Sequence, residues 1–175
     1  MSDRMNLPFV SKDSIKEILF NTLGHGDREW TEKLNDPTYK LLTYFIEQHL
    51  VVGRSMFIES PYDDDFPSAA LKKLQSQYEY ICVQIMCFAQ PETLIKRFES
   101  RIGAPDRHPG HNDEAAFEHF KTTIKKTGKV RPQSLEGKVI ELDTTDLGLV
   151  SIESLLAQID ECVKNAKASS QALAS

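Results

Sequence analysis

The sequence lacks the features that mark several common classes of protein. No apolar run approaches the ~20 residues that span a bilayer, and the first ten residues, MSDRMNLPFV, lack the apolar core of a signal peptide. The net charge is −5 and no long basic run is present, so general binding to the phosphate backbone of nucleic acid is not expected. We therefore expect a cytoplasmic protein with neither a membrane nor a nucleic acid as its partner.

Cysteine is also scarce. The chain has three cysteines and no CxxC pair, and Cys82 and Cys87 lie in a strongly apolar stretch. This predicts reduced, buried thiols, and neither a disulfide framework nor a zinc site. The length of 175 residues, with 40% hydrophobic and 27% charged residues, fits one domain. We place this domain at residues 1–166 and expect the small and polar residues 167–175 to fray.

Short apolar segments alternate with helical patterns along the chain. Strands are predicted at residues 7–10, 55–59, 80–88 and 138–142, with helices between them and after the last. The segment YICVQIMCF, residues 80–88, is nearly continuous in apolar character, which is typical of a strand buried on both faces. The alternation predicts an α/β fold with three αβα layers and a mostly parallel sheet.

Helix boundaries and core positions follow from the same pattern. A helix that begins near Ile15 is expected to end at Gly24, and Asp36 with Pro37 predicts the cap and first turn of another. The apolar stripe of that second helix predicts core packing, and it consists of Leu41, Leu42, Phe45, Ile46, His49 and Leu50. Further helices are expected to begin at Pro67, with Leu71 and Leu74 inward, and at Pro91, Asn112 and Ser151.

The most distinctive stretch is residues 97–111, which carries three arginines and two histidines among glycines and prolines. Arg97 and Arg101 are four residues apart and would share a helix face, and Arg107 follows in a mobile loop. Three converging guanidinium groups suit a polyanion such as phosphate, whereas the alternative is a solvated helix end with a surface loop. For His108 and His111 a structural or phosphate-contacting role is preferred to a metal site, because no third ligand follows at a suitable spacing.

Five segments together resemble the P-loop kinases of small molecules and nucleotides, a group that includes zeta-toxin-like and adenylate-kinase-like AAA family ATPases. The segments are LPFVSKDSIKEILF, SMFIES, CVQIMCFAQPETLIKRFESR, RHPGH and VIELDTT. The resemblance extends from about Leu7 to Ile159, and R-x3-R followed by RHPGH is its most specific part. It implies phosphoryl transfer from ATP, with Mg²⁺, to a nucleotide or small-molecule acceptor.

The resemblance also implies roles for individual residues. Asp13 falls where the family keeps an acidic residue near the acceptor, and Lys12 and Lys16 beside it would bind an anionic part of the substrate. Glu59 falls at a strand end where such kinases keep a carboxylate that acts on Mg²⁺. The remaining positions would face ATP: Arg97, Arg101 and Arg107 in the lid over the phosphates, His108 and His111 beside them, and Asp143 and Thr144 near the adenine.

Several of these assignments have a plainer alternative. Asp13 could be only a helix N-cap, Glu59 a solvated strand end, and Asp143 with Thr144 a turn. The run from Asp63 to Asp65 is more typical of a solvated loop than of a metal cluster.

One feature of the resembling family has no counterpart in the sequence. The Gly-rich loop GxxxxGK[ST], whose backbone N–H groups hold the phosphates of ATP, has no match in the 175 residues. In the family this loop stands just upstream of the segment matched by LPFV, so we expect the first strand and the P-loop to be absent. Loss of a central strand would leave two sheet edges unpaired, which an oligomer could cover. A shortened sequence and a true remnant both remain open explanations.

The sequence therefore predicts a kinase-like protein that is inactive as written. The alternative function is a non-catalytic remnant that binds an anion or the acidic surface of a partner. A phosphate-ester hydrolase is a third possibility, for which only the run from Asp63 to Asp65 offers a candidate metal cluster. The composition of residues 15–35, which would line the acceptor pocket in the family, does not define the acceptor.

Overall fold

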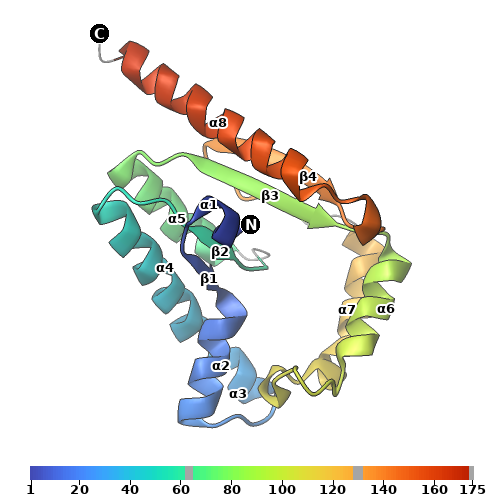
Figure 1. Cartoon of the computed structure of the whole chain (residues 1–175). Helices are drawn as coiled ribbons and strands as arrows, with labels where there is room; N and C mark the ends of the chain where they lie inside the picture. The colour runs from blue at the N-terminus through green and yellow to red at the C-terminus, as the bar shows by residue number, and fades with distance from the viewer. Residues whose placement is uncertain (62–64, 128–131, 174–175) are drawn as a thin grey trace.

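The computed structural model describes residues 1–61, 65–127 and 132–173, in which helices alternate with short strands (Figure 1). The strands are β1 (Phe9–Ser11), β2 (Phe57–Glu59), β3 (Cys82–Phe88) and β4 (Gly137–Asp143). The helices are α1 (Ser2–Met5), α2 (Lys12–Leu23), α3 (Arg28–Lys33), α4 (Asn35–Val51), α5 (Asp65–Tyr78), α6 (Pro91–Arg101), α7 (Asp113–Thr127) and α8 (Ile152–Leu173), with 3-10 turns at Pro109–His111 and Leu147–Leu149. The mixed α/β character expected from the alternating pattern is confirmed.

The strands pair in parallel, but they form two separate pairs. β1 lies beside β2, with Phe9 opposite Phe57, and β3 lies beside β4, with Cys82 opposite Gly137. A helical crossover joins the two strands of each pair, which is what parallel pairing requires. No ladder joins β2 to β3 among the described residues, so the prediction of one mostly parallel sheet is wrong in this respect. Apolar periodicity identifies a strand but does not specify its neighbours.

The burial of β3 also differs from the prediction. Its residues are half-buried, and Cys87 is exposed, so the strand is not buried on both faces and its cysteines are not fully buried. β3 pairs with a strand on one side only, and its Val83 and Ile85 pack against the cluster that includes Leu155 and Ile159 of α8. Cys82, Cys87 and Cys162 are free, and burial raises the pKa of the Cys82 thiol above its usual value.

Two helix starts are set by residues other than those predicted. Ser11 caps α2, because its hydroxyl accepts a hydrogen bond from the Ser14 N–H at 3.4 Å, so the interpretation of Asp13 as the N-cap is wrong. α4 begins at Asn35 after Leu34, and the predicted cap Asp36 instead pairs with Lys40 at 2.8 Å. The predicted end of α2 at Gly24 is confirmed, and so is the predicted start of the last helix at Ser151, whose hydroxyl caps α8.

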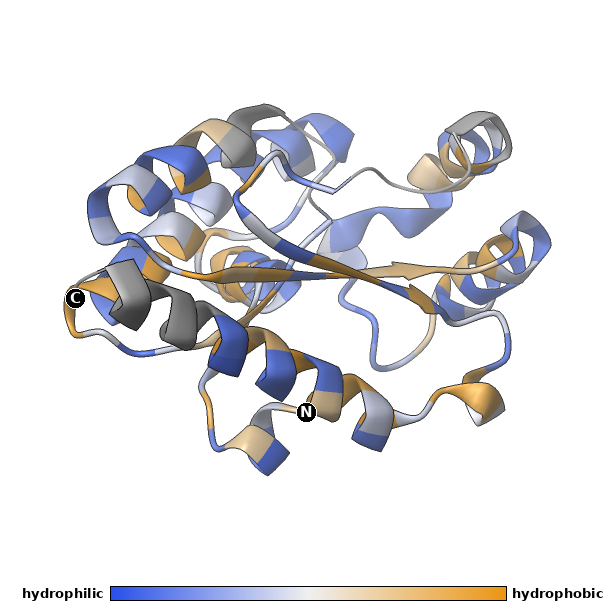
Figure 2. Cartoon of the chain, turned by 90° about the horizontal axis from the view of Figure 1, so that it is seen from above, coloured by the Kyte–Doolittle hydropathy of each residue, from blue (hydrophilic) through white to orange (hydrophobic). Residues whose placement is uncertain are grey.

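The core consists of two clusters. One joins α2, α4 and α5 through Ile15, Tyr39, Leu42, Ile46, Leu71 and Leu74. The other places Leu155 and Ile159 of α8 against Ile140 of β4, and Figure 2 shows α8 lying along this strand pair. The inward positions predicted for α5 are confirmed. On α4, however, Leu41 and Phe45 are exposed, because only one side of the helix meets α2 and α5.

None of the described helices combines the length and the apolar character that crossing a membrane requires. α8 continues to Leu173, past the point at which a frayed tail was expected to begin, and residues 174–175 lie outside the described part.

Candidate functional site

The α6–α7 hairpin positions the arginine-rich stretch. Phe98 of α6 stacks on Phe117 and Phe120 of α7, with ring centroids 5.6 and 4.4 Å apart. These contacts hold the two helices side by side, and the loop between them reaches α2 and α3 (Figure 1). The hairpin therefore carries Arg107 from a distant part of the sequence to the start of α2.

Arg107 is the centre of the charged cluster. It binds Asp113 through two bonds, from Nε to Oδ2 at 2.6 Å and from Nη2 to Oδ1 at 3.1 Å, and its Nη1 donates to Asp13 Oδ2 at 3.1 Å. Arg101 adds a longer contact to Asp113, at 3.4 Å, and lies over the Phe98 ring. Burial tends to lower the pKa of Arg107, but the two carboxylates raise it overall. The structure thus brings together three predicted site residues, Asp13, Arg101 and Arg107.

Asp13 is held as a carboxylate in this cluster. Burial tends to raise its pKa, but the charge of His111, the Arg107 guanidinium and Lys12 together lower the pKa below its usual value. A carboxylate with a lowered pKa is a weak base and a good hydrogen-bond acceptor. Asp13 is therefore suited to orient a hydroxyl group more than to remove its proton.

The two predicted substrate lysines lie on α2 near Asp13. Lys16 is buried, with 4% of its surface exposed, and its Nζ donates to Asn35 Oδ1 at 2.7 Å. Burial and the nearby Lys12 lower the pKa of Lys16 to about 8. Lys12 is half-buried, with its Nζ 5.3 Å from the centre of the Tyr39 ring. This side of the cluster can accept an anionic group.

Replacing Lys16 with methionine should change how stability depends on pH. The pKa of Lys16 is near 8 in the folded state and 10.5 as its usual value. Between pH 8 and pH 10.5 the unfolded chain therefore binds more protons than the folded protein. The wild-type free energy of unfolding should therefore rise relative to that of Lys16→Met as the pH increases from about 8 to 10.5, by at most roughly 3 kcal/mol. Denaturation in urea across this range measures the difference. Lys40→Met, at an exposed lysine, serves as the control, and an equal pH profile for both variants would contradict the burial of a charged Lys16.

The two histidines hold the loop to α2. His108 stacks on Phe20 at 5.1 Å, accepts from the Gly110 N–H through Nδ1, and can therefore donate from Nε2 to Asn21 Oδ1 at 3.3 Å. His111 Nε2 bonds Glu17 Oε1 at 2.8 Å. These contacts support the structural role for both residues. Contact with a phosphate stays a prediction.

Further residues that the sequence did not point to fasten the same loop. Thr31 donates to the Gly110 carbonyl at 2.8 Å, and Asn112 donates to the Gly26 carbonyl and to Thr31 Oγ1. A Cβ on Gly110 would lie 2.6 Å from the Phe20 ring, so this position has no space for a side chain. The predicted cap Asn112 has φ 52° and uses its side chain for these bonds, not to cap α7. The part of the loop from Arg107 to Asn112 is therefore anchored to α2 and α3, and the expected mobility of the loop stays a prediction.

Arg97 lies apart from the Asp13 cluster. Its Nη2 donates to the carbonyls of Thr144 and Thr145 at 2.7 and 3.3 Å, and Thr144 in turn donates to the Phe88 carbonyl. Arg97 thus joins α6 to the segment after β4. Asp143 is exposed and its Oδ1 accepts from the Thr145 N–H, which is the turn that was given as the alternative.

Glu59 lies at the end of β2, where its Oε2 accepts from the Ser11 hydroxyl at 2.8 Å. Beside it, the Ser60 Oγ is buried and has no hydrogen-bond partner in the part of the chain that the structure describes. Among the described residues no three His, Cys, Asp or Glu side chains come together as metal ligands. Mg²⁺ usually takes one or two carboxylates together with phosphate oxygens, so the action of Glu59 on Mg²⁺ stays a prediction. Asp63 and Asp64, which were considered as metal ligands, lie outside the described residues.

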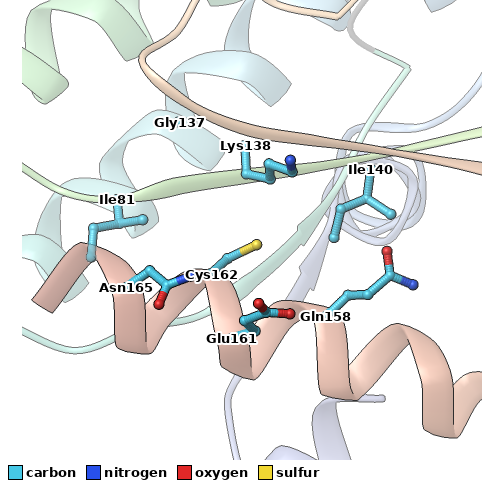
Figure 3. A pocket seen from close by; sticks show the side chains of 8 residues that line it. All are labelled: Ile81, Gly137, Lys138, Ile140, Gln158, Glu161, Cys162 and Asn165. Carbon is cyan, nitrogen blue, oxygen red and sulfur yellow. The ribbon is translucent and has the colours of Figure 1, made fainter. Parts of the chain in front are cut away.

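A hollow of about 450 Å³ lies elsewhere, between α8 and the amino ends of β3 and β4 (Figure 3). Its lining includes Ile81, Gly137, Lys138 and Cys162. β4 spans seven residues, so Asp143 at its other end is about 20 Å away. In parallel α/β folds the ligand binds at the carboxyl ends of the strands. We therefore assign the candidate site to the Asp13–Arg107 cluster and not to this hollow.

Comparison with known proteins supports a kinase-like fold. No protein-family model and no curated protein matches the chain. A solved structure that does match is the crystal structure of a "putative kinase" from Chloroflexus aurantiacus, with 27% sequence identity and a TM-score of 0.85. The match covers 92% of this chain and 86% of that one. The chain thus has the fold of a kinase-like protein, and this neighbour supports a function of the same general kind.

Proposed function

We propose that the chain carries the acceptor side and the phosphate-facing arginines of a P-loop kinase with three αβα layers, which transfers a phosphoryl group to a nucleotide or small molecule. The observation that carries this proposal is the pairing of Arg107 with Asp13, 94 residues apart in the sequence. A kinase needs an acceptor-orienting carboxylate close to cations that offset the charge of the transferring group. The likeness to the Chloroflexus protein supports the same assignment.

In this proposal the residues divide by position. Asp13 accepts a hydrogen bond from the acceptor hydroxyl, because its lowered pKa keeps it ionised. Arg107 and Arg101 face the phosphoryl group, and Asp113 holds the Arg107 fork in place. Lys12 and Lys16 bind an anionic part of the acceptor. Arg97 and Thr144, joined at the end of β4, mark the nucleotide side.

The residues present do not fit ATP and Mg²⁺ as completely as they fit an acceptor. The 175 residues contain no GxxxxGK[ST] loop, and Glu59 is a single carboxylate. We therefore propose that the 175-residue chain does not catalyse ATP turnover by itself.

Thermal unfolding with pyrophosphate tests the anion site. A ligand that binds only the folded state stabilises it by about 1.4 kcal/mol at ten times its dissociation constant, which corresponds to a rise in Tm of roughly 3–5 °C. Pyrophosphate should raise the Tm of the wild type and of Arg54→Gln, which alters an exposed arginine outside the cluster, but not that of Arg107→Gln. An equal rise in all three proteins, or none in the wild type, would contradict the assignment.

ATP hydrolysis and phosphoryl transfer, measured on the same samples with Mg²⁺, test the second part of the proposal. No turnover is expected. Turnover that is lost in Arg101→Gln would show that the chain is a complete catalyst.

The missing GxxxxGK[ST] loop also favours a second function, a non-catalytic anion-binding protein. In that case pyrophosphate would still raise the Tm of the wild type but not that of Arg107→Gln. Asp13→Asn would not weaken the binding of any phosphate acceptor.

A further inference from the structure

Arg107 divides its hydrogen bonds unequally between two carboxylates. Its Nε and Nη2 form a fork on Asp113, at 2.6 and 3.1 Å, whereas its Nη1 makes a single bond to Asp13 Oδ2 at 3.1 Å. The Asp113 side chain is 10% exposed and the Asp13 side chain is 37% exposed. A fork of two bonds is stronger and more restricted in geometry than a single bond. The bond between Arg107 and Asp13 is therefore the weaker and the more accessible of the two contacts.

The charges around Arg107 are balanced before any ligand binds. One guanidinium meets two carboxylates, and Arg101 offsets the second of them through a contact of 3.4 Å with Asp113. An anion that approached Arg107 with both carboxylates in place would be repelled by two negative groups at close range. If the anion instead takes the place of Asp13 on Nη1, the number of anionic groups on the guanidinium stays the same. Exchange of Asp13 thus avoids a third anionic group on one cation.

Asp13 has other neighbours that would keep it ionised after such an exchange. Burial tends to raise its pKa, but the charges of His111 and Lys12 lower the pKa in addition to the effect of Arg107. A carboxylate released from Arg107 would therefore still accept hydrogen bonds. Its Oδ2 would then be free for a new donor, such as a hydroxyl group.

We propose that the Arg107–Asp13 ion pair is a latch that a phosphate group opens. The phosphate group takes the place of Asp13 on Nη1 of Arg107, Asp113 keeps its fork, and Asp13 becomes available to the acceptor hydroxyl. This inference rests on the proposed function and adds an order to it, in which the phosphate group binds before the acceptor. Without the anion, the latch holds the acceptor-orienting carboxylate against the cation that faces the phosphoryl group, so the pair is autoinhibitory.

Isothermal titration calorimetry with pyrophosphate tests the latch on the full chain. Asp13→Asn should bind pyrophosphate about 3- to 10-fold more tightly than the wild type, because one charge-assisted hydrogen bond no longer has to be broken. Asp106→Asn is the matched control: it removes the same charge from an exposed residue next to Arg107 in the sequence, and its affinity should stay within about twofold of the wild type. Circular dichroism verifies that each variant is folded.

A crystal structure of the wild type with pyrophosphate tests the exchange itself and needs no variant. A phosphate oxygen should lie about 3 Å from Arg107 Nη1, with Asp13 beyond hydrogen-bond distance and the Asp113 fork unchanged. A complex in which Asp13 still binds Nη1 would overturn the latch, and so would an Asp13→Asn variant that binds pyrophosphate no more tightly than Asp106→Asn. Either result leaves the anion site of the proposed function intact. Failure of pyrophosphate to bind both the wild type and Asp13→Asn would overturn the latch together with that site.

Discussion

Replacing Gly137 with alanine is expected to open the first rung of the β3–β4 pair and to destabilise the fold strongly. Gly137 has φ +144°, and a Cβ at this position would lie 1.9 Å from the Cys82 carbonyl oxygen, which belongs to the partner strand. A backbone atom cannot move aside as the end of a side chain can, so the first rung of the ladder must open. We expect the free energy of unfolding to fall by roughly 4 kcal/mol or more, because the variant combines a steric overlap with an unfavourable backbone conformation.

Gly53→Ala provides the matched control for this variant. Gly53 also has a positive φ, +64°, but no atom lies within 4 Å of its Cβ position. Its substitution should cost only the backbone strain of about 1–2 kcal/mol. Urea denaturation of the two variants and the wild type separates the overlap from the strain. If both variants lost the same stability, the close approach of Cys82 to Gly137 would be wrong.

The order of strands and helices was predictable because each element has its own periodicity. The apolar residues of α5 and α8 repeat at helical spacing, and Leu71, Leu74, Leu155 and Ile159 are all buried. The pairing of the strands was not predictable, since periodicity does not encode a neighbour. The two-sided character of α4 was equally ambiguous: Leu41 and Leu42 are adjacent apolar residues, and only the position of α2 and α5 determines which one is buried.

Part of the candidate site could be predicted for a chemical reason. Asp13 follows a strand and Arg101 and Arg107 belong to a Gly- and Pro-rich stretch, so residue type and position both pointed to them. Asp113 was missed because an acidic residue in the first turn of a helix has an ordinary explanation in the helix dipole. Thr31 and Asn112 were missed because their signal is tertiary: they are 81 residues apart and hydrogen-bond each other.

The Arg107→Gln variant should have the largest effect on the site. Arg107 is the shared partner of Asp13 and of Asp113, whose side chain is 10% exposed. Glutamine keeps much of the length of the arginine side chain but not the charge. Two carboxylates would then face each other, Asp113 largely shielded from solvent and Asp13 with 37% of its side chain exposed. Removal of one partner of a fully buried ion pair costs about 3–5 kcal/mol, and because these groups are partly exposed we expect about 2 kcal/mol at neutral pH.

The pH dependence identifies the cause of this loss. The folded-state pKa of Asp13 is lowered below the usual value of 3.8, so its contribution to stability is present above that value and is lost as the pH falls through the lower, folded-state pKa. The wild type and Arg107→Gln should therefore differ most at neutral pH and converge as the solution is acidified below 3.8. Arg54→Gln should follow the wild type throughout.

A double variant with Asp113→Asn tests the pairing directly. It should lose less free energy of unfolding than the sum of the two single losses, because both changes remove the same interaction. A difference that persists in acid would mean that Arg107 acts through packing alone, and its assignment to the phosphate side of the site would then lose its electrostatic basis.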